Sequence, residues 1–210
     1  SGWRGARSAR LTVAHLLAGE NDEAQIQSES TSRWISWFLD QPRDEFDHHR
    51  QGPTADDFAA VLFQRLVEGD FPFIDSNLVR WKGRFALAVS EEILKLTELY
   101  DLKTGSTLLS ELITFVCSKD CTAQAIKLML LSRPRFLNTK QLKILSLSLK
   151  TIVSPDSYSE KGVDIDINLW SSGEIVQAAL SALIHNSRSS AAAIIKHYTF
   201  KHPSAYDFRD

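Results

Sequence analysis

Apolar residues recur at intervals of three and four along most of this chain. Such spacing places them on one face of an α-helix, whereas a half-buried strand would alternate at every second residue. The pattern is most regular after Asp75, where apolar residues stand at positions 78, 81, 85, 89, 93, 96 and 100. It predicts one long helix from Asp75, or two nearly collinear helices with a kink at Gly83 or Ser90.

Glycine, proline and capping residues mark where the periodic stretches begin and end. The chain has only 9 glycines and 6 prolines, and they punctuate the apolar pattern rather than interrupt it. Gly19 and Gly69 each follow a periodic stretch. Thr54 precedes another, with Asp57 at the capping-box position, and Asn138 precedes a further one. These signals predict about eight or nine helices and no convincing pair of strands, so the expected fold class is all-α.

Three stretches lack helical periodicity and are predicted to be irregular. Residues 20–30 form a polar run and residues 41–53 lie between two helix-ending signals, so both are expected to be loops. Residues 154–170 make the one long irregular connection. This connection is either a disordered insert or a binding loop. Its alternating VDIDINLW sequence would suit strand addition to a partner, although a short extended packing segment is the commoner outcome.

The short turns between helices constrain the architecture. Successive helices joined in this way pack as antiparallel neighbours, and a long series either closes into an irregular bundle or stacks as a solenoid. Over residues 54–200 the arrangement resembles a HEAT- or armadillo-like array by general pattern only, since no residue-level repeat recurs. We expect a single helical domain over residues 1–210. The abrupt ends, SGWRG and HPSAYDFRD, favour a fragment of a longer protein.

Composition narrows the class of protein. Of the 210 residues, 43% are apolar and 24% charged, which is typical of globular domains and disfavours disordered and membrane classes. No apolar run approaches the roughly 18–20 residues that cross a bilayer. Two cysteines cannot build a disulfide framework, so Cys117 and Cys121 are expected to be buried thiols in a reducing compartment. We therefore expect an intracellular protein of the cytoplasm or nucleus.

The stretch DEFDHHR, residues 44–50, is the part of the chain that most resembles a catalytic or metal-binding motif. Asp47, His48 and His49 spell the signature triplet of the Asp-His-His phosphoesterases. Those enzymes hold two metal ions with further carboxylates from several loops, and the parallel strands that would present them are not predicted. A zinc site would need a distant ligand. We expect a solvated loop, no enzyme, no cofactor and no bound metal, and a metal-dependent hydrolase is the least favoured alternative.

Tryptophan side chains are the best candidates for partner anchors, because Trp is enriched among the few residues that dominate an interface. The proposed anchors are Trp34, Trp37, Trp81 and Trp170. Core packing is the commoner fate of a pair spaced like Trp34 and Trp37. The leading interpretation is nevertheless a protein–protein interaction module or scaffold of a larger complex, which presents a helical groove or aromatic patch. Self-association remains open.

Local basic clusters support an alternative interpretation, a nucleic-acid-binding helical repeat. The overall net charge of −2 creates no general attraction for nucleic acid. A groove for phosphates would need several basic side chains to converge on one face. The residues of this possible patch are Arg80, Lys82, Arg84, Arg133 and Arg135. Solvated helix faces explain most of the basic clusters, so nucleic-acid binding is possible but not favoured.

Overall fold

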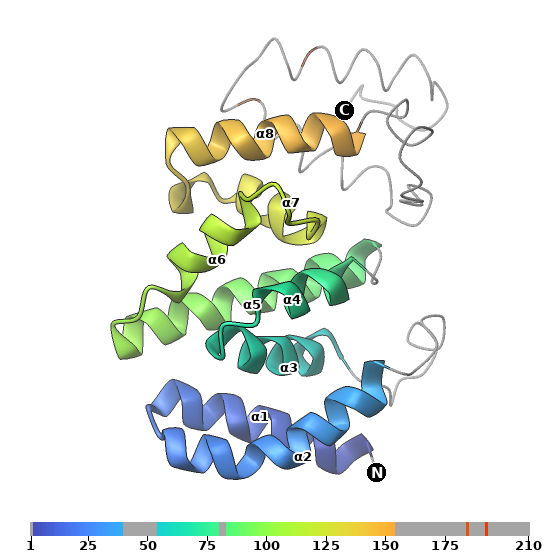
Figure 1. Cartoon of the computed structure of the whole chain (residues 1–210), viewed down its shortest axis with the longest axis vertical. Helices are drawn as coiled ribbons and strands as arrows, with labels where there is room; N and C mark the ends of the chain where they lie inside the picture. The colour runs from blue at the N-terminus through green and yellow to red at the C-terminus, as the bar shows by residue number, and fades with distance from the viewer. Residues whose placement is uncertain (1, 40–53, 80–82, 154–183, 185–191, 193–210) are drawn as a thin grey trace, which may run out of the picture.

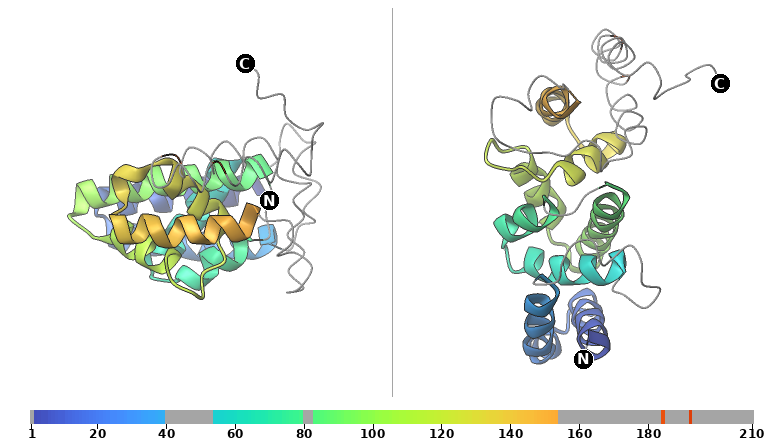
Figure 2. Two further views of the ribbon diagram at one scale, coloured as in Figure 1. Left: turned by 90° about the horizontal axis from the view of Figure 1, so that it is seen from above. Right: turned by 90° about the vertical axis from the view of Figure 1, so that its right-hand side faces the viewer.

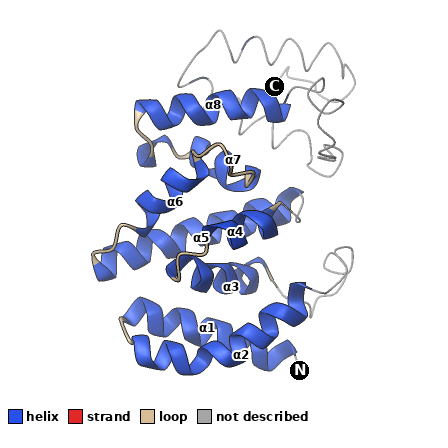
Figure 3. Cartoon of the chain, in the orientation of Figure 1, coloured by secondary structure: helices blue, strands red, loops and turns tan. Residues whose placement is uncertain are grey.

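The computed structural model describes residues 2–39, 54–79 and 83–153, together with the single positions 184 and 192. Within these ranges the chain forms eight α-helices and one 3-10 helix and contains no strand (Figures 1 and 3). The prediction of an all-α fold is confirmed for this part of the chain. In order, the elements are α1 (Gly2–Ala18), α2 (Asn21–Leu39), α3 (Ala55–Val67), α4 (Phe71–Leu78), α5 (Gly83–Thr104), α6 (Leu108–Val116), α7 (Gln124–Ser132), η2 (Pro134–Phe136) and α8 (Thr139–Val153).

The described helices are stacked along the longest axis of the molecule, with the α1–α2 pair first and α8 last (Figure 1). Figure 2 shows α1 and α2 side by side at the base of this stack. Helix α1 packs against α2, α3 and α5, while α5 also packs against α3, α6 and α7. Helix α8 packs against α7. Helix α5 is therefore the central element of the described stack.

Glycines in a left-handed backbone conformation follow α1, α3 and α5. Gly19, Gly69 and Gly105 have φ values of 77°, 81° and 71°, a left-handed conformation that costs glycine little because it lacks a Cβ atom. After α1 the backbone N–H of Gly19 donates to Leu16 O at 3.1 Å, and that of Glu20 donates to His15 O at 2.9 Å. This pair of bonds satisfies carbonyls that a helix end leaves without partners. The predicted ends at Gly19 and Gly69 are confirmed.

The start of α3 combines a capping box with an ion pair to α1. The Thr54 side chain accepts a hydrogen bond from the backbone N–H of Asp57, and Asp57 Oδ2 accepts one from the backbone N–H of Thr54 at 2.9 Å. Asp57 Oδ1 lies 2.6 Å from Arg10 Nη2. The capping box was predicted from sequence, and the ion pair explains how the same carboxylate also holds α1 against α3.

The predicted loop over residues 20–30 is wrong, because α2 begins at Asn21 and includes nearly all of it. In the first half of α2 the buried residues are few and are small or polar, namely Ala24 and Thr31, whereas the large buried residues Trp34 and Ile35 come later. Thr31 Oγ1 donates to Gln27 O at 2.9 Å and lies 3.0 Å from Thr12 Oγ1 of α1. A search for large apolar residues misses such a face. The predicted irregular segments 41–53 and 154–170 lie outside the described residues.

The sequence left open one long helix from Asp75 or two helices with a break at Gly83 or Ser90, and the single long helix is wrong. The chain forms two separate helices here, since α4 ends at Leu78 and α5 begins at Gly83. Helix α4 starts before Asp75, at Phe71, where the Asp70 side chain accepts a hydrogen bond from Phe73 N at 3.2 Å. The apolar period continues across the junction because both helices bury one face.

The core runs between α3, α5 and the helices that pack on them. The inner face of α3 is buried, with Phe58, Leu62 and Leu66 at most 2% exposed. Phe63 of α3 meets Tyr100 of α5 edge to face, with ring centroids 5.7 Å apart. In the described part of the chain, no helix combines the length and apolar character required to cross a membrane.

Candidate functional site

Of the four tryptophans predicted to be partner anchors, the structure describes the side chain of one. Trp34 is only 4% exposed, and it packs against Gly5 of α1. It is a core residue and lacks the exposed surface that a partner anchor needs, which corrects the expectation for this position. Trp37 belongs to α2, but its side chain is outside the described part of the structure. Trp81 and Trp170 also lie outside it, so these three remain predictions.

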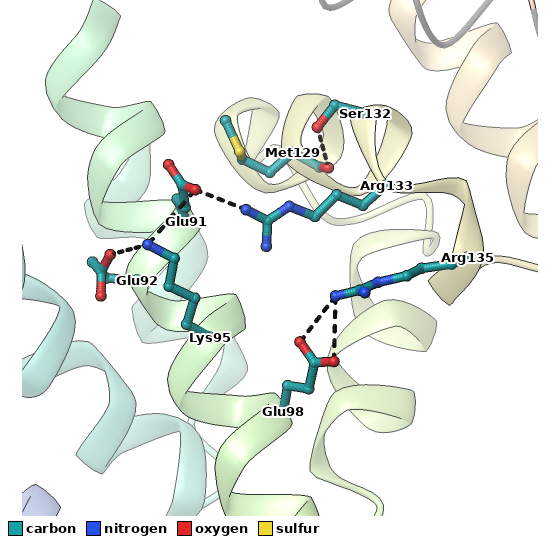
Figure 4. Close-up of polar contacts among 8 residues, drawn as sticks. All are labelled: Glu91, Glu92, Lys95, Glu98, Met129, Ser132, Arg133 and Arg135. Atoms are coloured by element: carbon teal, nitrogen blue, oxygen red, sulfur yellow. Dashed lines mark hydrogen bonds and ion pairs between the residues drawn. The ribbon is translucent and has the colours of Figure 1, made fainter.

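Two arginines of the predicted basic patch lie on one face, but each is paired with a carboxylate of α5 (Figure 4). Arg133 Nη2 donates to Glu91 Oε1 at 2.8 Å. Arg135 Nη2 donates to Glu98 at 3.3 Å, and its guanidinium also stands 4.6 Å from the ring centroid of Phe136. Arg80 and Lys82 lie outside the described residues, as does the side chain of Arg84.

Helix α5 adds a lysine to this face. Lys95 Nζ lies 2.6 Å from Glu92 Oε1 and 3.7 Å from Glu91 Oε1. The hydrogen bond to Glu92 is the main reason that the pKa of Lys95 is raised. We name Glu91, Glu92, Lys95, Glu98, Arg133 and Arg135 the α5–α7 charge cluster. Its three cations and three carboxylates cancel, so Arg133 and Arg135 do not add up to a positive surface for phosphates.

Both cysteines are free thiols in a structural setting. Cys121 is buried, as predicted, whereas Cys117 is half-buried. Burial raises the pKa of Cys121 to about 12, with a further contribution from the nearby Asp75 carboxylate, and burial also raises the pKa of Cys117. Asp75 Oδ1 accepts a hydrogen bond from Thr122 N at 2.9 Å, and Lys127 Nζ donates to Cys121 O at 2.7 Å. This arrangement ties α4 to the turn before α7 and keeps the thiols in their unreactive form.

The Asp47, His48 and His49 triplet lies outside the described residues, so the structure does not test it. Within residues 2–39, 54–79 and 83–153, no group of three or more His, Cys, Asp or Glu side chains is placed to hold a metal ion.

Two hollows flank the turn between α1 and α2, at the edge where α1, α3 and α5 end (on the left in Figure 1). The larger one, about 570 Å³, lies between this turn and the C-terminal end of α5, where Tyr100 and Lys103 line it. The smaller one, about 320 Å³, lies between the α1–α2 pair and the C-terminal end of α3. We name the smaller hollow the hairpin-edge groove. Its lining residues are Thr12, Leu16, Asn21, Ala24, Gln25, Ser28, Gln64, Val67 and Glu68.

Gln64 is the unusual residue of the hairpin-edge groove. It is only 5% exposed, and its Nε2 donates to Glu68 Oε1 at 3.2 Å. Its Oε1 accepts no hydrogen bond from any of the described residues. Sequence reasoning missed this groove. The available signal was a glutamine within the apolar stripe of α3, four residues before an acidic residue at the helix end.

Known protein families, curated proteins and solved structures were all compared with this chain, and none of them gave a significant match.

Proposed function

We propose that this chain is a protein–protein interaction module of a larger intracellular complex. Its partner binds at the edge of the molecule where α1, α3 and α5 end and the chain turns into the next helix. The observation that carries this proposal is the pair of hollows that flank the α1–α2 turn. Interface anchors are side chains that fill such hollows, and a polar rim around them excludes water. The two unpaired thiols favour the reducing environment of the cytoplasm or nucleus.

The proposal includes an α-solenoid-like arrangement of the helices, similar in pattern to HEAT or armadillo arrays. Its support is the repeated construction of the hairpins, because α1, α3 and α5 each end at a left-handed glycine and are each followed closely by the next helix. The main contacts also run between near neighbours in the stack. Stacked repeats of this type build extended surfaces that bind partners.

Site-specific photocrosslinking in cells tests this function. A photoreactive amino acid replaces Asn21, which lines both hollows, and in a matched control it replaces the exposed Lys143 of α8. We expect Asn21 to capture a small, reproducible set of proteins that Lys143 does not capture. Mass spectrometry identifies them. Equal capture at the two positions, or capture at Lys143 alone, would contradict a partner surface at the hairpin edge.

A further inference from the structure

Two arginines of α1 are exposed and have no carboxylate partner among the described residues. Elsewhere in the described chain, five arginines each lie 2.6–3.8 Å from a carboxylate oxygen, namely Arg10, Arg33, Arg65, Arg133 and Arg135. Arg4 and Arg7 form no ion pair with any described residue. Helix α1 itself cannot neutralise them, because it contains no Asp or Glu. These two guanidinium groups are therefore accessible to carboxylates from outside the described structure.

Arg4 and Arg7 begin a row of exposed residues along α1. The row continues through Leu11, Ala14 and Ala18, and its spacings of three and four residues place all five on one face of the helix. We name these five residues the outer α1 stripe. Leu11 is 39% exposed, so the stripe has an apolar part after its two charges. It spans about 21 Å along the helix axis, which is about four turns.

The outer α1 stripe leads to the larger of the two hollows. Helix α1 runs from its N-terminal end to the turn at the left of Figure 1, and Ala18 at the end of the stripe lines the hollow there. Lys103 of α5 lines the same hollow. It is exposed and, like the two arginines, forms no ion pair with any described residue. Accessible positive charges therefore stand at both ends of this path, with an apolar part between them.

This pattern favours an acidic amphipathic helix as the occupant. Arginine pairs with carboxylates through two parallel hydrogen bonds, and it is enriched in protein interfaces, where lysine is depleted. The first 79 residues of the chain contain seven arginines and no lysine. Leu11 and Ala14 offer an apolar contact that a phosphate backbone would leave uncovered, so the stripe suits a protein helix better than a nucleic acid.

We propose that the outer α1 stripe binds an acidic amphipathic helix of the partner protein. Carboxylates of that helix pair with Arg4 and Arg7, its apolar side chains pack on Leu11 and Ala14, and a further carboxylate reaches Lys103 across the larger hollow. This inference rests on the proposed function. It names the chemistry of the partner and extends the partner surface from the turn between α1 and α2 along α1.

Binding of labelled probes to the full chain tests the inference. The main probe is a helical peptide of glutamate, leucine and alanine, long enough to span the stripe, and fluorescence anisotropy reports its binding. The comparison probes are the same peptide with every glutamate replaced by glutamine and a single-stranded oligonucleotide of equal charge. We expect the glutamate peptide to bind about tenfold more tightly than either comparison probe, and added salt to weaken its binding.

Substitutions in the stripe locate the binding site. Arg4→Gln combined with Arg7→Gln is expected to weaken binding of the glutamate peptide about threefold to tenfold. Leu11→Ser and Lys103→Gln should each weaken it about twofold to fivefold, because each removes one contact at the rim of an interface. Urea unfolding of each variant verifies that it folds.

The matched control is Lys140→Gln combined with Lys143→Gln, which removes the same charge from exposed residues of α8. It should leave binding of the glutamate peptide unchanged. Equal losses in the two double variants, equal binding of the glutamine peptide, or tighter binding of the oligonucleotide would overturn the acidic-helix site. Those results would not affect crosslinking at Asn21, so failure of this site and failure of the interaction module remain distinguishable.

Discussion

At the scale of single residues, Gly5 of α1 lies directly against the Trp34 side chain of α2. A Cβ atom added there would overlap the Trp34 side chain, and Trp34 is itself buried. Alanine is ordinarily the better helix former by about 1 kcal/mol, but overpacking costs about 1–3 kcal/mol, so the clash decides the sign. We expect Gly5→Ala to lower the free energy of unfolding in urea. In a Trp34→Leu background the same substitution should cost less, and an unchanged cost would contradict the contact.

Cys121 gives a prediction for alkaline pH. Its pKa is raised from 9.0 to about 12, so below pH 9 the thiol is neutral in both the folded and unfolded chain. Between about pH 9 and 12 the unfolded chain releases the proton first, and stability falls as pH rises. We expect the free energy of unfolding in urea to decrease more steeply from neutral pH to pH 11 in the parent chain than in Cys121→Ala. Parallel pH profiles would show that the thiol keeps an ordinary pKa.

At the scale of elements, the α5–α7 charge cluster links α5 to the helices that follow it. The Arg133–Glu91 pair is shorter and less exposed than the Arg135–Glu98 pair. Exposed pairs contribute about 0–1 kcal/mol, so we expect a double-mutant cycle to give a larger coupling for Arg133–Glu91. Added salt should weaken the coupling of Arg135–Glu98 more, because its side chains are more exposed. A larger coupling for Arg135–Glu98 would indicate that geometry and burial do not rank these pairs.

The same elements show what the sequence can predict. Local signals were sufficient where one or two residues define a helix end, as with Gly19, Gly69 and the Thr54 capping box. They failed for the first half of α2, where the buried residues up to Thr31 are only Ala24 and Thr31 and become recognisable once α1 lies against them. The hairpin-edge groove could not be predicted for a related reason. It forms where the α1–α2 turn packs beside the C-terminal end of α3, and no local sequence pattern predicts contacts between these distant segments.

At the scale of the whole molecule, the described helices form a stack with α5 at its centre, and the α1–α2 pair and α8 are the first and last of them. Helix α5 contacts α1, α3, α6 and α7, whereas α8 packs mainly on α7. Ile93 of α5 and Leu145 of α8 are both fully buried, so the two sites differ in their position in the stack rather than in burial. In an array of neighbouring contacts, loss of an end element leaves the centre folded, but loss of the centre separates the two ends.

Hydrogen exchange measured by mass spectrometry can distinguish destabilisation of α8 from destabilisation of the central helix α5. Replacing Ile93 or Leu145 with alanine leaves a cavity that costs about 2–5 kcal/mol at either site. We expect Leu145→Ala to speed exchange in α7 and α8 while α3 keeps its protection. Ile93→Ala should speed exchange in α1, α3, α5 and α7 together, because their shared contacts pass through α5. If both variants lowered protection uniformly, the described helices would unfold as one cooperative unit, and the partner surface would depend on every layer of the stack.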